Sequence, residues 1–167
     1  MLDLIIKGGT VVAPEGASLM DVGIEGEKIV AVGAPGTLDS PGVRTIDATG
    51  KIVLPGGIEP HTHINVPVPD YWAGGKSEVF TQPPEAASRA AAFGGVTTYV
   101  DFAGNLPLNP GAVPTADPIM SQIEKRRQTF TGHSYTDFTF HYILAGAVSP
   151  QTIGEIGEAI QSGLASF

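Results

Sequence analysis

The sequence predicts an α/β fold in two parts, because the rhythm of its apolar segments changes near Pro55. Before this point, short β-branched runs recur every ~8–12 residues between turn residues, which is typical of a β-sandwich or partial barrel. After it, strands alternate with helical segments in units of roughly 35–50 residues, which predicts a parallel sheet. Such a sheet occurs in doubly wound folds and in (β/α)8 barrels.

Residues 1–53 form the predicted N-terminal β-sandwich subdomain, and three segments supply its strands. The segment DLIIKGGTVVAP holds two short apolar runs broken at Gly8 and Gly9. The segment DVGIEGEKIVAVG holds two alternating runs joined across residues 25–28, which is a hairpin signature. The segment VRTIDATGKIVLPG repeats this scheme, with a turn at residues 48–50.

Residues 54–167 form the predicted α/β part, in which KIVLPGGIEPHTH is an apolar strand that ends in polar groups. Further strands are predicted at residues 96–104, ending at Asp101, and at residues 136–146. Helices are predicted at residues 83–95, 117–130 and 149–164. The first starts with proline and ends in Gly-Gly, the second starts with Asp117 and has basic residues in its last turns, and the third has Ser149 as its N-cap. Residues 165–167 open a fourth strand.

Three β/α units and the opening of a fourth do not close an eight-stranded barrel, which typically takes ~250 residues. They leave a strand edge and an apolar helix face uncovered. We therefore expect residues beyond 167, and expect residues 54–167 to be the start of a barrel truncated before its fourth strand ends.

The composition excludes several classes of function. A formal net charge of -8 disfavours nucleic acid and anionic membrane surfaces as partners. The sequence has no cysteine, which excludes a disulfide framework and thiolate chemistry. Its first residues lack a basic n-region, and no apolar run approaches the ~20 residues of a membrane span. These features predict a cytoplasmic protein.

Two of the four histidines, His61 and His63, stand one residue apart at the end of LPGGIEPHTH. In a strand, both imidazoles point to one face and Thr62 to the other. At the C-terminal end of a barrel strand, that face is the mouth where active sites lie. Both rings can then reach one divalent ion at about 2.0–2.1 Å, with Glu59 and Asp101 as candidate carboxylates nearby. The alternative interpretation is a polar cap on the strand end.

The segments VLPGGIEPHTH and AAAFGGVTTYVDF, and the order of the N-terminal runs before them, resemble the amidohydrolase superfamily. Within it, they are similar to the cyclic-amidase branch of dihydropyrimidinases, hydantoinases and allantoinases. The resemblance covers nearly the whole chain. It implies a (β/α)8 TIM-like barrel, of which only the first three to four units are present, with a flanking N-terminal β-sandwich subdomain.

The resemblance also implies a metal cluster. In the family, the His-x-His pair binds one of two zinc ions, and a carbamylated lysine at the end of barrel strand four bridges both. Since the family's strand-four motif resembles Gly-x-x-Ser-Phe-Lys and this sequence ends GLASF, we expect that lysine immediately after Phe167. Two Zn²⁺ ions, or another divalent metal, then activate a water molecule. The remaining ligands and a proton-shuttling aspartate are expected beyond residue 167.

The loop after the first barrel strand helps to form the substrate pocket in hydantoinase-like enzymes. Here it holds Tyr71 and Trp72 as a candidate apolar wall; the alternative is packing of the loop against its own helix. Asn65 is a candidate substrate ligand, because allantoinases have a similar His-x-Asn. Asp101 supports the metal site or caps the next loop, and His141 is interpreted as a hydrogen-bonded structural histidine.

The resemblance implies hydrolysis of a cyclic amide or ureide C–N bond, such as the ring opening of a dihydropyrimidine or hydantoin. One alternative is an allantoinase or another amide, carbamate or urea hydrolase. Another is a mononuclear deaminase, which lacks the strand-four lysine. A last alternative is a catalytically silent scaffold such as the collapsin-response mediator proteins, which have lost metal histidines. The family resemblance also implies a homotetramer.

Overall fold

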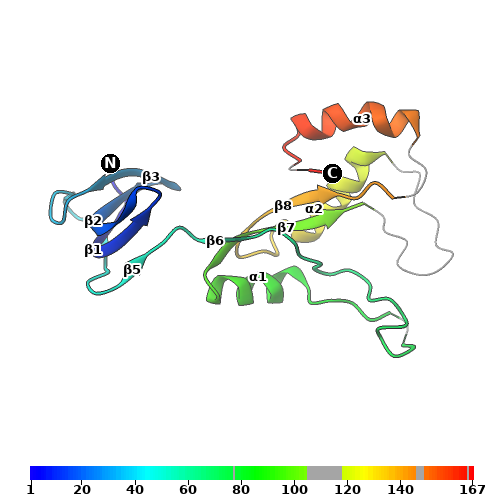
Figure 1. Ribbon diagram of the computed structural model, residues 1–167, viewed down its shortest axis with the longest axis horizontal. Helices are drawn as coiled ribbons and strands as arrows, with labels where there is room; N and C mark the ends of the chain where they lie inside the picture. The colour runs from blue at the N-terminus through cyan, green and yellow to red at the C-terminus, as the bar shows by residue number, and fades with distance from the viewer. Residues whose placement is uncertain (77, 105–117, 146–148, 165) are drawn as a thin grey trace. The chain divides into compact units, whose positions relative to one another are not determined.

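The structure, a computed structural model, describes residues 1–76, 78–104, 118–145, 149–164 and 166–167. The chain divides into two compact units, Met1–Pro55 and Gly56–Phe167. The first unit is all β and the second alternates strands with helices (Figure 1).

The first unit is one sheet in the part of the chain that the structure describes. Its strands are β1 (Leu4–Ala13), β2 (Gly16–Glu25), β3 (Lys28–Gly33), β4 (Arg44–Asp47) and β5 (Ile52–Val53). They run in the order β3-β2-β1-β4, and β5 also pairs with β1. The β2–β3 hairpin closes with Glu25 opposite Lys28, which confirms the hairpin predicted across residues 25–28.

The two apolar runs of residues 3–14 lie in one strand, because β1 continues through Gly8 and Gly9, where the predicted break is an irregularity in the pairing. The β1–β2 register shifts between Ile6 and Gly9, which marks a bulge. Gly8 absorbs the irregularity with φ +71°, a left-handed conformation that favours glycine. At Gly9, an added Cβ would lie 2.5 Å from a methyl carbon of Val53, so β5 packs against bare backbone there.

The second unit holds a parallel sheet in the order β6-β7-β8, as the alternation of strands and helices predicted. Its elements are β6 (Gly57–Glu59), α1 (Pro84–Phe93), β7 (Val96–Ala103), α2 (Ile119–Phe130), β8 (Asp137–Tyr142) and α3 (Pro150–Gln161). Beyond α3, Ser166 forms a parallel bridge with His141.

Two predicted helix starts have different outcomes. Ser149 caps α3, because its side chain accepts a hydrogen bond from the Thr152 amide, as predicted. Asp117, the predicted first residue of the second helix, lies outside the described residues. The first amide of α2, that of Ile119, donates instead to Glu155 of α3 at 2.7 Å, so a neighbouring helix satisfies it.

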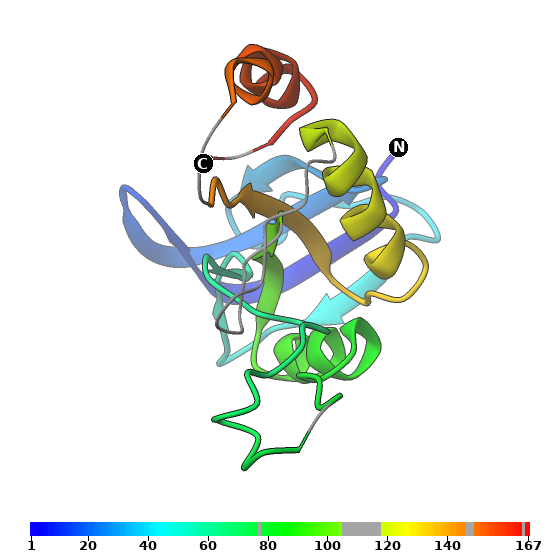
Figure 2. The same cartoon turned by 90° about the vertical axis from the view of Figure 1, so that its right-hand side faces the viewer.

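The core of this unit lies between one face of the sheet and the helices. Tyr99 of β7 and Phe140 of β8 pack with Ile123 and Phe130 of α2. Figure 2 shows α1 and α2 on the same side of the strands. Because side chains alternate along a strand, Phe102 and His141 point to the opposite face of the sheet. The helices have 10, 12 and 12 residues, and no described helix is long and apolar enough to cross a membrane.

Candidate metal centre and adjoining pocket

The two histidines follow β6 and do not lie in it, because that strand ends at Glu59. The chain nevertheless continues along β7, where the Thr62 amide donates to the Val100 carbonyl at 3.1 Å. Thr62 also turns its hydroxyl toward Val100, while the imidazoles of His61 and His63 converge, with their Nε2 atoms 3.2 Å apart. The two imidazoles therefore converge as expected, although residues 61–63 do not form the regular strand from which this was predicted.

Phe102 of β7 supports three imidazole rings. Its ring lies 4.6 Å from the His61 ring, 4.9 Å from the His63 ring and 5.1 Å from the His141 ring, measured between centroids. The His63 ring stacks on it at an interplanar angle of 20°. Sequence reasoning missed Phe102, although strand alternation after the helix-facing Asp101 indicates that it points toward the histidines.

The arrangement of His61 and His63 fits a divalent metal ion. Two nitrogens 3.2 Å apart that each bind one ion at about 2.0–2.1 Å subtend an angle of roughly 100°, close to the tetrahedral value. A neutral imidazole has one nitrogen with a lone pair, so both Nε2 atoms can bind the ion when the ring protons are on Nδ1. Among the described residues no group of three His, Cys, Asp or Glu side chains gathers at one point. The pair supplies two of the four ligands that a tetrahedral zinc ion takes.

The two carboxylates expected near the metal have other contacts. Glu59 accepts a hydrogen bond from the His61 backbone amide at 3.1 Å. Asp101 was expected at the end of its strand, but it lies inside β7 and is 0% exposed. It faces the helices, where its Oδ2 accepts from the Ile64 amide at 2.7 Å. In the described part of the chain, both carboxylates thus hold the backbone that carries the imidazoles.

His141 of β8 joins the histidine segment to the end of the chain. Its Nε2 donates to the Pro60 carbonyl at 2.8 Å, and its Nδ1 hydrogen-bonds the Ser166 hydroxyl. A proton on Nε2 leaves Nδ1 of the neutral ring as an acceptor for the serine. The prediction of a hydrogen-bonded structural histidine is confirmed, and one of its partners, Pro60, directly precedes His61.

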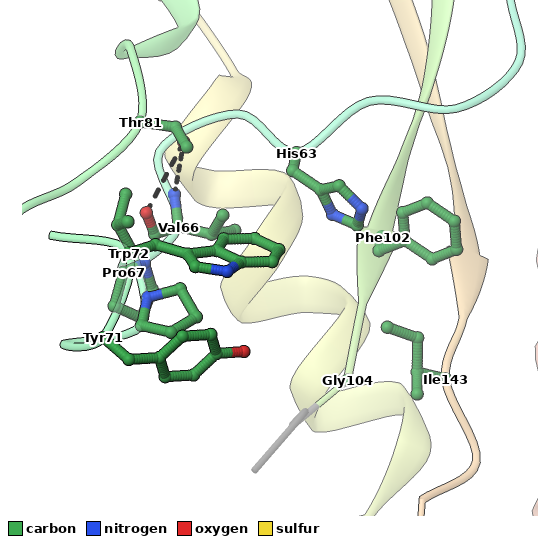
Figure 3. Close-up of a pocket in the computed structure, with 11 residues that line it drawn as sticks. His63, Val66, Pro67, Tyr71, Trp72, Thr81, Phe102, Gly104 and Ile143 are labelled. Carbon is green, nitrogen blue, oxygen red and sulfur yellow. Dashed lines mark hydrogen bonds between the residues drawn. The ribbon is translucent and has the colours of Figure 1, made fainter. Parts of the chain in front are cut away.

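A cavity of about 410 Å³ adjoins His63. Figure 3 shows Trp72 and Tyr71 on one side of it, and His63, Phe102 and Ile143 on the other. The two loop rings meet edge to face at 5.5 Å. They are 66% and 74% exposed, so they are not buried against a helix, and one face of the cavity is open to a ligand. Among the described residues, the lining is apolar apart from His63 and Thr81.

Asn65 begins the loop that leads into this cavity. Its φ of +49° is left-handed, which asparagine tolerates better than most residues. Its amide donates to the Gln82 carbonyl at 2.9 Å and its carbonyl faces Arg126 at 3.5 Å. The contacts of Asn65 within the described residues are made by its backbone, so a side-chain contact with substrate stays a prediction.

Comparison with known proteins shows what the whole chain resembles. No family model matches it. Over 164 residues, 98% of the chain, it is 35% identical to a D-hydantoinase from Geobacillus stearothermophilus and spans 31% of that protein. The crystal structure of a dihydropyrimidinase from Brevibacillus agri superposes with a TM-score of 0.78 and 32% identity, over 96% of this chain and 31% of that one.

An allantoinase from Salmonella choleraesuis is similar over a shorter stretch. It is 40% identical over 107 residues, which are 64% of this chain and 20% of the allantoinase. The chain thus spans about a third of the length of the hydantoinases, and the allantoinase match covers less of both proteins.

Proposed function

We propose that this chain is part of a metal-dependent hydrolase. The chain belongs to the hydantoinase and dihydropyrimidinase branch of the cyclic amidases, in the amidohydrolase superfamily. The reaction proposed is hydrolysis of a ring C–N bond in a cyclic amide or ureide. Water adds its hydroxyl to the ring carbonyl carbon and its proton to the ring nitrogen, and the product is an N-carbamoyl amino acid. The observation that carries the proposal is the 3.2 Å approach of the His61 and His63 Nε2 atoms beside a cavity.

His61 and His63 are proposed to hold one of two divalent metal ions, most simply zinc. Metal ions held there would lower the pKa of a water molecule and polarise the scissile carbonyl. Phe102 contacts both imidazole rings and so restricts their orientation. The histidines are thus proposed to bind the metal ion, and Phe102 to orient their rings. The group that moves the proton is proposed to be an aspartate outside residues 1–167.

A lysine carbamate directly after Phe167 is proposed as the bridge between the two ions. An ammonium group has no free lone pair, whereas a carbamate would supply two oxygens that share one negative charge as metal ligands. The hydrogen bonds of His141 support this placement, because they join Ser166 to the carbonyl of Pro60, next to the first metal histidine.

The substrate proposed is a hydantoin or dihydropyrimidine whose ring substituent is apolar. Tyr71 and Trp72 supply flat apolar surface, and no charged side chain lines the described part of the cavity. An allantoinase is the alternative, supported by the 40% identity over 107 residues. The polar ureido substituent of allantoin would need hydrogen-bond partners, of which the described residues of the cavity wall offer few. The homotetramer, the complete barrel with its β-sandwich and the cytoplasmic location are further proposals that rest on the resemblance.

The test uses the full-length protein purified without chelator. We expect near-stoichiometric divalent metal by elemental analysis and ring opening of 5-benzylhydantoin or dihydrouracil, with slower turnover of allantoin. His61→Ala or His63→Ala should lower kcat/KM by at least about 10³-fold, because Lewis-acid catalysis is worth several kcal/mol. His133→Ala is the matched control, since this histidine is exposed and lies in a turn after α2. A metal-free wild-type protein would instead support the scaffold alternative, and preferred allantoin turnover would support the allantoinase.

A further inference from the structure

We propose that Asp101 and Arg126 form a clamp that sets the spacing of the His61 and His63 imidazoles, and that both are positioning residues. The inference rests on the proposed function, because it assumes that these imidazoles bind a metal ion. The clamp lies on the helix-facing side of the sheet, so neither residue needs to touch the metal or the substrate. It acts on the backbone from the opposite side to the rings.

Asp101 uses both carboxylate oxygens. Its Oδ2 accepts from the Thr62 hydroxyl at 3.1 Å and from the Ile64 amide at 2.7 Å. Its Oδ1 accepts from the Phe102 amide at 2.7 Å and forms an ion pair with Arg126. Thr62 and Ile64 are the two neighbours of His63 in the chain, so one buried carboxylate fixes the backbone on both sides of that residue.

Arg126 reaches the same segment from helix α2. Its Nε lies 3.2 Å from Asp101 Oδ1, its Nη2 donates to both Asp101 and the Ile64 carbonyl, and its Nη1 faces the Asn65 carbonyl at 3.5 Å. The guanidinium also lies over the Phe130 ring, 4.8 Å from its centroid. Only 13% of the arginine side chain and none of the aspartate side chain is exposed. The guanidinium fork therefore joins strand, helix and histidine segment at one point.

The chemistry of the clamp argues for a role in geometry. A buried ion pair contributes little net stability compared with well-packed apolar side chains of similar volume, because both charges lose their hydration. What the pair adds here is directional, because five hydrogen bonds join it to main-chain groups of Ile64, Asn65 and Phe102 and to the Thr62 hydroxyl. Apolar side chains could fill this space but could not fix the peptide orientation that aims two imidazoles at one point.

The same bonds connect the metal centre to the pocket. Past the clamp, Asn65 takes a left-handed conformation and the chain continues into Val66, which lines the cavity. The Val66 amide in turn donates to the Thr81 hydroxyl at 3.0 Å, as Figure 3 shows. A shift at Arg126 is therefore expected to reach the two imidazoles first and the cavity wall second.

The experiment compares full-length variants at neighbouring positions of α2. Arg126→Gln removes the cation and Arg126→Lys keeps the charge but loses the planar fork. Arg127→Gln is the matched control, because Arg127 is the next residue, its side chain is 49% exposed and it pairs with Glu124 on the same helix. Each apoprotein is titrated with Zn²⁺ against a chromogenic chelator, and the Co²⁺-substituted forms are compared by their visible absorption spectra.

We expect Arg126→Gln to bind zinc about 10–100-fold more weakly than wild type, as loss of partners behind a ligand commonly does. Arg126→Lys should recover part of this loss, Arg127→Gln should match wild type, and the Co²⁺ bands of Arg126→Gln should shift. Thr62→Val guards against misfolding, because it removes one hydrogen bond of the clamp and nearly preserves side-chain shape; a several-fold weaker affinity is expected.

The outcomes separate this inference from the proposed function. If wild type binds zinc and folded Arg126→Gln binds it within two-fold of wild type with an unchanged Co²⁺ spectrum, the clamp is refuted and the metal site stands. If Arg126→Gln does not fold, wild-type affinity in Thr62→Val refutes the clamp in the same way. If wild type itself binds no divalent ion, the proposed function fails first.

Discussion

Each of the two units places one fully buried aspartate between segments that lie far apart in the sequence, but the two carboxylates have different partners. Asp21 of β2 accepts from the Gly8 amide at 2.8 Å and the Gly36 amide at 2.7 Å. Asp101 of β7 accepts from backbone and hydroxyl donors and also pairs with Arg126. The first carboxylate ties the bulge of β1 to the turn after β3, while the second holds a segment whose side chains are aimed at a common point.

The side chains around these aspartates differ as well. Residues 1–55 contain no histidine and no aromatic residue, so every imidazole and aromatic ring of the chain lies in residues 56–167. The first unit therefore has neither imidazole ligands nor ring surfaces to offer a substrate. A buried carboxylate marks a candidate positioning residue only where the segment it holds carries reactive side chains.

The largest expected effect is that of Asp101→Ala. The substitution removes the carboxylate partner of Arg126, whose side chain is only 13% exposed, and breaking such a buried pair costs about 3–5 kcal/mol. Amide hydrogen exchange should show faster exchange in peptides that cover residues 57–66 and 96–104, and zinc affinity should fall with it. Unchanged exchange in these peptides would contradict the assigned burial of the pair.

A smaller effect is expected for Asp21→Asn in the first unit. An amide group has one carbonyl oxygen, so one of the Gly8 and Gly36 amides loses its acceptor, which costs about 1–3 kcal/mol. Hydrogen exchange should rise in peptides of residues 4–36, whereas zinc affinity and kcat should stay within two-fold of wild type. Loss of zinc from this variant would break the comparison, because the first unit would then influence the metal centre.

The smallest expected effect is the loss of folding stability at alkaline pH that follows from ionisation of a buried tyrosine. It belongs to the second unit, since residues 1–55 hold no tyrosine. Burial raises the pKa of the Tyr99 phenol above its ordinary value of 10.0, and a hydrogen bond with Ser134 opposes this. The folded state thus holds the phenolic proton more tightly than the unfolded state. Its contribution to stability is complete below about pH 10 and is lost as the pH rises through the folded pKa.

Tyr99→Phe tests this sign. The variant lacks the 2.8 Å contact with the Ser134 hydroxyl, so it should be less stable at pH 8 by about 1 kcal/mol. Between pH 8 and pH 10.5 its thermal midpoint should fall less than that of wild type. Tyr135→Phe is the control, because Tyr135 is 64% exposed and should follow wild type. If the thermal midpoint of Tyr99→Phe fell as much as that of wild type over this pH range, burial of the Tyr99 phenol would not be the cause of the alkaline destabilisation.

Several elements were predictable because their signals are local. The hairpin at residues 25–28, the Ser149 cap and the parallel order of the second sheet follow from turn residues, capping and the alternation of strands and helices. The role of Arg126 was not predicted, although the sequence indicates on which face of α2 it lies. Ile119, Ile123, Arg126 and Phe130 recur at helical spacing, so the arginine lies on the apolar face while Arg127 points to solvent.

The sequence by itself determined that two imidazoles stand one residue apart where an all-β part gives way to β/α units, and local periodicity suffices for that. Only the tertiary structure decided that Asp101 binds the backbone of the histidine segment and that the Phe102 ring contacts three imidazoles. It also decided that His141 hydrogen-bonds both Pro60 and Ser166. These contacts join residues 25 to 81 positions apart. Strand pairing and helix packing bring them together, and no local pattern in the sequence encodes that meeting.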